Sequence, residues 1–422
     1  MAIKIAVVGA GSSYTPEIIE GLMQRKDTIP VREVALYDIN ERRLEIMASF
    51  CRRYAAHMNY DVKITHTTNR TEALMDADFL NVQIRVGGNQ ARVQDEKIPL
   101  RYGIVGQETT GPGGFMKACR TIPVMIDLAR EVERVCPNAW IVNYTNPTGL
   151  VTQAVQTNTR AKIAGLCAGG FFPRDNLHKY MGFERDEITY DYFGLNHMNF
   201  AYNVMIGNRP LTREEFDTFA ERQERYDPEE MKTLGMFLTP YLRWYYNTQE
   251  LLEKNTRAEK TRGEMVLEIE KEIFAALEDP NCVTKPEALK RRGGGGYSEI
   301  AIGIIEAMVN NRDRWMVINA PNKGTIPFLP DDAVIETGCL VNAAGIHPLK
   351  LSSIPESVWG LACAVKNYEQ LAVKAAVTGD RRTAYLALMA HPLVRDWGKV
   401  KPMLDEMLEA NRAYLPQFFP SK

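Results

Sequence analysis

The sequence predicts an α/β fold, in which a doubly wound parallel sheet is followed by a mainly helical α+β domain. Three observations lead to this prediction. Short apolar runs alternate with segments of helical spacing through the first half of the chain. A glycine-rich turn follows the first apolar run, at residues 9–11. Beyond residue 212 the spacing is mainly helical, and 422 residues exceed a single typical core.

The first apolar run and its turn lie in the stretch KIAVVGAGSSYTP. Residues 5–8 have the composition of a fully buried parallel strand. Gly9 and Gly11 then allow a turn tight enough for the backbone to approach a pyrophosphate. A helix from about Pro16 directs its N-terminal amides at the same negative charge. The pattern departs from G-x-G-x-x-G at its last place, where Tyr14 replaces glycine.

A second predicted strand, residues 33–37, ends on Asp38. An acidic residue at this distance from the glycines suits the ribose hydroxyls of NAD rather than a 2′-phosphate. We therefore predict a Rossmann-like domain that binds NAD through Gly9, Gly11 and Asp38. The alternative for the glycine pair alone is an ordinary strand-to-helix turn.

The alternation of strands and helices continues to about residue 166. Further strands are predicted at residues 62–65, 79–84, 140–142 and 162–166. Helices are predicted at residues 41–57, 71–75 and 118–135 and from about 147, with a loop at 103–114.

The second half has a different pattern. Between residues 188 and 205 the predicted strands are shorter and aromatic-rich. Helices are predicted at residues 227–254, 265–277 and 297–310, and prolines and glycines between 327 and 348 predict a loop-rich crossover. We expect an NAD-binding domain at residues 1–195 and a substrate-binding and catalytic domain at 196–422.

Composition and charge argue against several classes of partner. The formal net charge is −2, which gives no electrostatic reason to expect nucleic acid or an anionic membrane as a partner. Seven cysteines are scattered without a CxxC pair, as is typical of reducing compartments. No signal sequence and no long uninterrupted apolar segment are recognisable. We therefore expect a cytoplasmic protein.

Polar residues gather where the predicted parallel strands end. Open sheets bind their ligands outside the carboxyl ends of the strands. The residues concerned are Arg85 and Arg92 in IRVGGNQAR, Gln107 and Glu108 in GQETTGPGG, Asn143 and Asn146 in NYTNPTG, and Cys167. Each alone is best explained as a satisfied polar group at a loop end. Together, at neighbouring strand ends, they predict a ligand site.

At these residues the sequence resembles glycoside hydrolase family 4, the NAD-dependent glycosidases, and most closely its 6-phospho-β-glucosidase branch. The matching stretches include VVGAGSSYTPEIIEGL, EKIPLRYGIVGQETTGPGGF, CPNAWIVNYTNPTGLVT, FGLNH, TPYLRWYY, RRGGGGYS and LPDDAVIE, and they span residues 4–350. The resemblance implies NAD and Mn2+ as cofactors and a phosphorylated disaccharide or glucoside as substrate. We also expect a homodimer or a homotetramer.

The chemistry that the resemblance implies differs from hydrolysis by two carboxylates. Bound NAD+ removes a hydride from C3 of the sugar, and the resulting ketone acidifies the proton on C2. A base removes that proton, the substituent on C1 leaves by elimination, and water adds before NADH returns the hydride. This sequence needs a base, a metal that polarises the carbonyl and a nicotinamide held over the ring.

The resemblance assigns the metal to Cys167 and His197. The softness of a thiolate–imidazole pair suggests zinc or iron, whereas the family uses Mn2+ with sugar hydroxyls in the remaining positions. From the sequence alone, an inert buried thiol and a satisfied loop histidine are the simpler interpretations. Tyr241, in TPYLRWYY, matches the catalytic base, which a nearby metal must activate because a free phenol is too weak. The alternative is that Tyr241 packs on one aromatic helix with Tyr245 and Tyr246.

The remaining site residues also follow from the resemblance. The cofactor turn includes Ser12 and Ser13. Arg92, Asn146 and Arg292 match positions that contact the substrate, and arginines suit a sugar phosphate through paired hydrogen bonds. The alternative for Arg292 is a solvated basic turn.

One stretch departs from the family. After the metal cysteine the β-acting branch usually carries Asn, a small apolar residue and Pro, and α-acting members carry Asp or His. Here the run is Ala168-Gly169-Gly170. Ala168 has no proton to donate, which argues against the α-glucosidase mode, and Glu108 is a candidate for the general acid.

We therefore predict hydrolysis of 6-phospho-β-glucosides. One alternative is an NAD-dependent 2-hydroxyacid dehydrogenase, which shares the fold and would release NADH at each turnover. The other is a non-catalytic sensor of NAD or sugar phosphate, which would turn over no glycoside.

Overall fold

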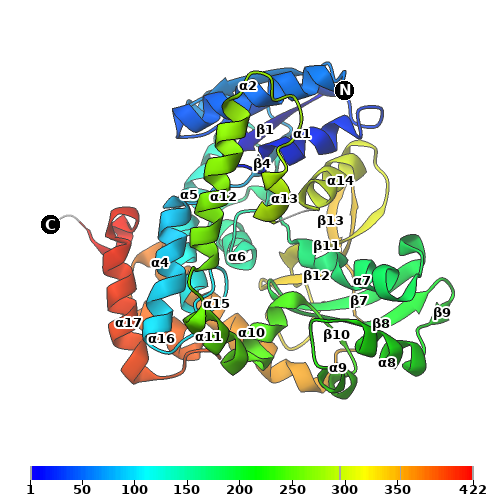
Figure 1. Ribbon diagram of the computed structural model, residues 1–422, viewed down its shortest axis with the longest axis vertical. Helices are drawn as coiled ribbons and strands as arrows, with labels where there is room; N and C mark the ends of the chain where they lie inside the picture. The colour runs from blue at the N-terminus through cyan, green and yellow to red at the C-terminus, as the bar shows by residue number, and fades with distance from the viewer. Residues whose placement is uncertain (1, 294–295, 352, 421–422) are drawn as a thin grey trace.

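One sheet of nine strands, counted within the described residues, runs through the molecule in the order β13-β12-β11-β6-β5-β4-β1-β2-β3 (Figure 1). The structure is a computed structural model that describes residues 2–293, 296–351 and 353–420. Gly294 and Gly295 of the stretch RRGGGGYS therefore lie outside the described residues.

Six strands form the parallel half of this sheet. They are β1 (Ile3–Val8), β2 (Val31–Tyr37), β3 (Lys63–Thr67), β4 (Phe79–Val82), β5 (Trp140–Asn143) and β6 (Lys162–Gly165). Neighbours among them run parallel. Ile5 and Val7 pack into one core cluster and Ala6 and Val8 into another, on the opposite face, which explains the uninterrupted apolar run. The strand order 3-2-1-4-5-6 is that of a Rossmann fold, so the predicted fold class is confirmed.

The helices between these strands cover the sheet. They are α1 (Thr15–Met23), α2 (Glu41–His57), α3 (Arg70–Leu74), α4 (Gly88–Arg101), α5 (Gly111–Val135) and α6 (Thr148–Asn158). The prediction of a loop at 103–114 was wrong in its last part, because α5 already begins at Gly111. A Cβ atom at Gly113 would lie 2.3 Å from the carbonyl oxygen of Gln107. The glycines that suggested a loop therefore let α5 begin in direct contact with the preceding backbone at Gln107.

The C-terminal half adds three antiparallel strands to the same sheet. They are β11 (Arg314–Pro321), β12 (Val334–Asn342) and β13 (Gly345–Pro348). The predicted loop-rich crossover at 327–348 was therefore wrong over most of its length. A Cβ atom at Gly338 would lie 2.8 Å from Nε1 of Trp315 on β11. This glycine makes room for a neighbouring strand's side chain, which the local sequence does not reveal.

A second, antiparallel sheet follows the parallel half along the chain. Its strands are β7 (Ile188–Leu195), β8 (Met198–Ile206), β9 (Arg209–Pro210) and β10 (Phe237–Leu238). The aromatic-rich strands predicted between 188 and 205 are confirmed as the hairpin of β7 and β8. The turn of this hairpin carries His197, whose φ angle is +65°.

Most of the remaining chain is helical. The helices are α7 (Phe172–Met181), α8 (Arg213–Arg222), α9 (Pro228–Leu234), α10 (Arg243–Tyr246), α11 (Thr248–Arg257), α12 (Arg262–Glu278), α13 (Ala288–Arg292), α14 (Tyr297–Val309), α15 (Trp359–Thr378), α16 (Arg381–Ala390) and α17 (Trp397–Ala410). The helices predicted at 265–277 and 297–310 are confirmed as α12 and α14. In Figure 1, α12 runs beside α4, which it contacts, and α17 packs on the other side of α4.

The helix predicted at 227–254 is broken into pieces. Gly235, with φ of +64°, ends α9 in the left-handed conformation that favours glycine. Strand β10 follows, and then a 3-10 turn, η3 (Pro240–Leu242). Tyr241 therefore lies on this short turn and not on the helix α10 that carries Tyr245 and Tyr246.

The predicted boundary at residue 195 coincides with the last residue of β7. The division into domains 1–195 and 196–422 stays a prediction, and β11 to β13 extend the sheet that β1 begins. Among the described residues, no helix combines the length and the apolar character needed to cross a membrane.

Candidate active site

A cavity of about 730 Å³ lies at the carboxyl ends of β1, β2, β4 and β5. This is the edge of the sheet at which ligands are expected. The sequence-predicted residues in its wall are Gly9, Gly11, Ser12, Asp38, Arg85, Glu108, Asn146, Tyr241 and Arg292. Ser13, Arg92, Cys167 and His197 are not part of this wall.

The glycine turn is held against two neighbouring strands. A Cβ atom at Gly9, where φ is +87°, would lie 3.0 Å from the carbonyl carbon of Gln83. The amide of Gly9 donates to the carbonyl oxygen of Tyr37 at 2.9 Å, and the amide of Gly11 donates to Oδ2 of Asp38 at 2.8 Å. The turn, the start of α1 and a carboxylate thus face one cavity. This arrangement fits the pyrophosphate and ribose of NAD.

The two serines of the turn differ in their surroundings. Ser12 lines the cavity, and its Oγ accepts a hydrogen bond from the amide of Tyr14 at 3.3 Å. Ser13 is fully buried, and its Oγ donates to Oε1 of Glu270 at 3.3 Å. Ser13 therefore attaches the glycine turn to Glu270 on α12, whereas Ser12 faces the space in which a cofactor would lie.

Tyr14, which replaces the third glycine of the motif, contacts Arg292. Its hydroxyl donates to the carbonyl oxygen of Gly293 at 2.6 Å and accepts a hydrogen bond from Nη1 of Arg292 at 3.1 Å. The guanidinium of Arg292 lies over the Tyr14 ring, 4.7 Å from its centroid. Nε of Arg292 is 3.6 Å from the carboxylate of Glu270, too far for a hydrogen bond. The departure from the glycine motif thus joins the cofactor turn to a residue predicted to hold substrate.

His197 and Tyr241 form the second part of the site. Their rings are stacked with 3.6 Å between centroids and 6° between planes. Burial, followed by the charge of Lys117, lowers the pKa of His197 to about 3, so that its imidazole is neutral at pH 7. A metal ligand must be unprotonated in this way. Burial, followed by the charges of Cys167 and Glu108, raises the pKa of Tyr241, so the phenol needs a nearby cation before it can act as a base.

Cys167 follows β6 and is half-buried. Its Sγ accepts a weak hydrogen bond from the amide of Gly169 at 3.4 Å. Burial and the charge of Glu336 raise the pKa of the thiol, and a coordinated divalent cation would reverse this by stabilising the thiolate. The ring of Tyr241 stacks on one predicted ligand, His197, and the charge of the other, Cys167, contributes to the raised pKa of Tyr241.

The donor set around Tyr241 is small. Within the described ranges, no group of three or more His, Cys, Asp and Glu side chains could hold a metal ion. Cys167 and His197 would therefore supply two ligands, and oxygen atoms from outside the protein would have to supply the rest. This set fits a metal that is completed by the substrate.

The unusual run after Cys167 has a packing reason. Residues Ala168–Phe171 form a 3-10 turn, η1. A Cβ atom at Gly170 would lie 2.4 Å from Cβ of Val317 on β11. The turn therefore lies directly against the sheet, and a larger residue at position 170 would displace it.

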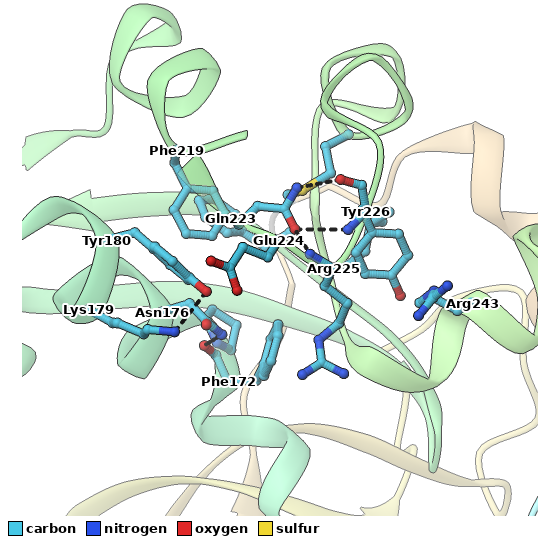
Figure 2. Close-up of a pocket in the computed structure, with 14 residues that line it drawn as sticks. Phe172, Asn176, Lys179, Tyr180, Phe219, Gln223, Glu224, Arg225, Tyr226 and Arg243 are labelled. Carbon is cyan, nitrogen blue, oxygen red and sulfur yellow. Dashed lines mark hydrogen bonds between the residues drawn. The ribbon is translucent and has the colours of Figure 1, made fainter. Parts of the chain in front are cut away.

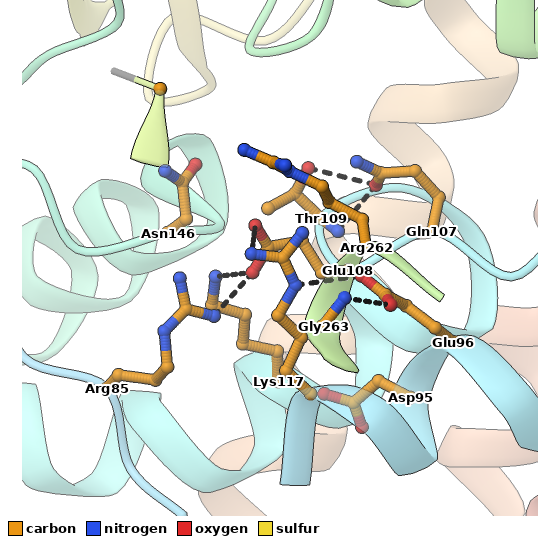
Figure 3. Close-up of polar contacts among 12 residues, drawn as sticks. Arg85, Asp95, Glu96, Gln107, Glu108, Thr109, Lys117, Asn146, Arg262 and Gly263 are labelled. Atoms are coloured by element: carbon orange, nitrogen blue, oxygen red, sulfur yellow. Dashed lines mark hydrogen bonds and ion pairs between the residues drawn. The ribbon is translucent and has the colours of Figure 1, made fainter. Parts of the chain in front are cut away.

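Glu108 is enclosed by three cations (Figure 3). Nζ of Lys117 lies 2.8 Å and Nη1 of Arg92 3.1 Å from its carboxylate, and Arg85 forms a short ion pair with it. Burial alone would raise the pKa of Glu108, but the charges of Arg85, Lys117 and Arg92 outweigh it and hold the pKa well below the usual value. The carboxyl group is ionised at neutral pH. This charge state argues against Glu108 as the general acid, and the assignment stays a prediction.

The same cluster determines how Arg92 is held. Its side chain is buried, and its Nε donates to Oε1 of Glu96 at 2.8 Å. Oε2 of Glu96 in turn accepts a hydrogen bond from the amide of Gly263 at the start of α12. Burial, followed by the charge of Arg85, lowers the pKa of Lys117 to about 7.

Asn146 faces the cavity just before α6, where its Oδ1 accepts a hydrogen bond from the amide of Thr148 at 3.3 Å.

A second cavity, of about 330 Å³, lies between α7, α8 and the segment 223–243 (Figure 2). It contains none of the predicted site residues. Its Arg243 is paired with Glu250 at 2.6 Å, and the hydroxyl of Tyr226 donates to the carbonyl oxygen of Thr239 at 2.5 Å. The larger cavity, which contains the glycine turn and Tyr241, is therefore the candidate active site.

Sequence reasoning missed four residues that shape this site. Tyr14 was visible only as a departure from the glycine motif, and Thr109 only as part of GQETTGPGG. Lys117 and Glu270 lie on long helices, α5 and α12, and reach the site through the tertiary structure alone. No local pattern distinguishes such helical residues from ordinary surface charges.

The chain matches the family described as "Family 4 glycosyl hydrolase" over residues 4–183 and the "Family 4 glycosyl hydrolase C-terminal domain" over residues 192–394. The chain therefore belongs to glycoside hydrolase family 4. A Bacillus subtilis protein described as "Probable 6-phospho-beta-glucosidase" is 40% identical over 433 aligned residues, which cover 99% of this chain and 98% of that protein.

Solved structures have the same architecture. The 6-phospho-beta glucosidase from Thermotoga maritima, solved with manganese, NAD+ and glucose-6-phosphate, has a TM-score of 0.92 and 33% identity and covers 98% of this chain and 99% of its own. Malate dehydrogenase from Plasmodium falciparum has a TM-score of 0.56 at 13% identity and covers 89% of this chain and 100% of its own. The second likeness reflects a shared fold alone.

Proposed function

We propose that this protein hydrolyses 6-phospho-β-glucosides with NAD+ and a divalent metal ion, Mn2+, as cofactors. One observation carries the proposal: Tyr241 lies in the wall of the cavity that the NAD-type glycine turn also lines, and its ring stacks on His197. A candidate base in the wall of the expected cofactor cavity is thereby in contact with one predicted metal ligand. The descriptions of the Bacillus and Thermotoga relatives support the choice of substrate.

Two separate groups of residues would hold the cofactors. Gly9, Gly11 and Asp38, with Ser12, would hold NAD+, and Cys167 and His197 would hold the metal. When bound, NAD+ would accept a hydride from C3 of the sugar and later return it, and the metal would polarise the C3 carbonyl. Ser13 would act indirectly, by supporting the turn through Glu270.

The chain's own residues would carry the elimination. Tyr241 would take the C2 proton, and the C–H electron pair would form the C1–C2 double bond as the bond from C1 to the aglycone oxygen breaks. Water would then add its oxygen at C1, and Tyr241 would return a proton to C2 after its hydroxyl group has exchanged with solvent. Arg292 and Asn146 line the cavity and would orient the phosphorylated sugar, with Arg92 behind them in the Glu108 cluster.

The general acid for the aglycone is not assigned to any residue. Ala168 has no acidic group, and Glu108 is ionised at neutral pH. A p-nitrophenolate leaving group needs no protonation, so a substrate with this aglycone tests the remaining steps by themselves.

The proposal is tested with p-nitrophenyl 6-phospho-β-glucoside, with and without NAD+ and Mn2+. We expect release of p-nitrophenolate only when both are present, and no net formation of NADH. The unphosphorylated glucoside serves as the control and should react far more slowly. Nicotinamide absorbance that grows in step with product would contradict the proposal and indicate a dehydrogenase. NAD+ binding without any turnover would indicate a sensor.

The proposal also covers the oligomeric state of the protein and its cellular compartment. We expect a homodimer or homotetramer in the cytoplasm. The seven cysteines, all within the described residues, are free thiols, as expected in a reducing compartment. Light scattering of the purified protein would give the oligomeric state.

A further inference from the structure

The loop that precedes α5 contacts the predicted metal ligand His197. Nδ1 of His197 lies 2.9 Å from Oγ1 of Thr109. No described residue forms a hydrogen bond with Nε2, the other ring nitrogen. Because a neutral imidazole carries one proton, the direction of the Thr109 contact decides which nitrogen is left with a lone pair.

The direction of this contact follows from Gln107. The side-chain atom Oε1 of Gln107 accepts hydrogen bonds from the backbone amides of Thr109 and Thr110, at 2.5 and 2.6 Å. Backbone amides are donors only, so the atom that faces them must be the amide oxygen and not the nitrogen. This oxygen also lies 3.0 Å from Oγ1 of Thr109 and has no proton to give. We assign the Thr109 proton to this contact, because it is a hydrogen bond only when the Thr109 hydroxyl donates to Gln107.

A hydroxyl group has only one proton. Since the Thr109 proton is directed to Gln107, an Oγ1 lone pair faces the imidazole. Nδ1 of His197 must then carry the proton and donate it to Thr109. Nε2 is left unprotonated, with its lone pair free of any described protein partner.

We propose that Gln107 and Thr109 fix His197 in the Nδ1–H tautomer and so reserve Nε2 for the catalytic metal ion. This inference rests on the proposed function, in which His197 is a metal ligand. Thr109 and Gln107 are positioning residues, because they act through His197. Supporting hydrogen bonds of this kind orient metal-ligating histidines and raise metal affinity.

The surroundings hold both ends of this hydrogen-bond chain in place. A Cβ atom at Gly114 of α5 would lie 2.5 Å from the carbonyl carbon of Thr109, so the loop is pressed against the helix. On the other side, the imidazole is stacked on Tyr241. The hairpin turn is anchored by Asn196, whose Nδ2 donates to Oε2 of Glu336 at 2.8 Å. The ring therefore cannot turn to another partner without moving a packed neighbour.

The first experiment measures Mn2+ binding to the NAD+-saturated protein from the electron paramagnetic resonance signal of free Mn2+. Thr109→Val keeps the shape of the side chain and removes its hydroxyl, and we expect Mn2+ affinity to fall ~10–100-fold. Thr109→Ser restores the hydroxyl and should restore affinity. Thr110→Val is the matched control, because Thr110 contributes only its backbone amide to Gln107. NAD+ affinity should be unchanged in all three variants.

The second experiment observes the tautomer directly, by 15N NMR of histidine-labelled protein without metal. His197→Asn identifies the signals of His197. We expect a protonated Nδ1 and an unprotonated Nε2 in the wild-type protein. This measurement needs no Thr109 variant, so it decides the tautomer even if Thr109→Val does not fold.

A protonated Nε2 in the wild-type protein would overturn the inference. An unchanged Mn2+ affinity of Thr109→Val would also overturn it, and so would a Thr109→Ser variant that binds Mn2+ as weakly as Thr109→Val. A wild-type protein with the Nδ1–H tautomer that binds no Mn2+ would instead overturn the metal assignment in the proposed function, while the hydrogen-bond chain would stand.

Discussion

The phenol ring of Tyr241 lies face to face with the imidazole of His197, with 3.6 Å between the ring centroids. The two residues come from different elements, the η3 turn and the β7–β8 hairpin. A charge bound at His197 therefore acts on the phenol at short range, where the surrounding protein screens it poorly. In the proposed function, this contact would connect metal binding at His197 to the basicity of Tyr241.

Replacing Tyr241 by Phe should lower the turnover of p-nitrophenyl 6-phospho-β-glucoside ~10²–10⁴-fold, the usual contribution of one general base. The ring and its stacking are kept, so the melting temperature should not change. In deuterated water the wild-type product should carry deuterium at C2. The matched control is Tyr246→Phe, because Tyr246 is exposed and lies on α10. A wild-type rate for Tyr241→Phe, or no deuterium at C2, would mean that another residue is the base.

Substitution of either metal ligand should abolish Mn2+-dependent turnover and leave NAD+ affinity intact. Cys167→Ser is nearly isosteric, and His197→Asn is preferred over Ala because Asn tolerates the φ of +65° at this position. Turnover, NAD+ affinity and melting temperature are measured side by side. Full activity of either variant in the presence of a chelator would show that the ligand assignment is incorrect.

Tyr14→Phe should raise the KM for the phosphorylated substrate about tenfold and change NAD+ affinity little. The substitution keeps the ring beneath Arg292 and removes the hydroxyl that accepts its hydrogen bond. Loss of a hydrogen bond to a charged group costs about 1.5 kcal/mol, which corresponds to about tenfold. Tyr14→Leu also removes the ring and should have the larger effect. If the KM of Tyr14→Phe is unchanged, Tyr14 does not position Arg292 for the substrate.

Glu108→Gln should destabilise the protein by up to about 3–5 kcal/mol at pH 7, because it removes the carboxylate that Arg85, Arg92 and Lys117 share, and the side chains of Arg92 and Lys117 are buried. The folded-state pKa of Glu108 is held below its unfolded value of 4.5. Its contribution to stability is therefore present above pH 4.5 and is lost as the pH falls through the folded pKa. The difference between wild type and variant in urea unfolding should shrink correspondingly in acid. A difference that is independent of pH would contradict this assignment.

The sequence by itself determined the parallel half of the fold and pointed to several of the residues that line the cavity. Strand β1, the turn at Gly9 and Gly11, and the acidic end of β2 are local patterns, because burial on both faces and close backbone approach restrict the residue types directly. The family stretches then identified Tyr241 and Arg292 by position.

Only the tertiary structure decided the rest, because it depends on groups far apart in the chain. β12 contains Gly338, a residue type typical of loops, and the absence of a Cβ atom there leaves room for the side chain of Trp315 on the paired strand. The charge state of Glu108 is set by Arg85, Lys117 and Arg92, whose side chains only the folded chain brings together around one carboxylate. Likewise, the proton on His197 is governed by Thr109, 88 positions earlier in the sequence. Hydrogen-bond direction and electrostatic balance are properties of assembled neighbours, and a chain acquires them only when it folds.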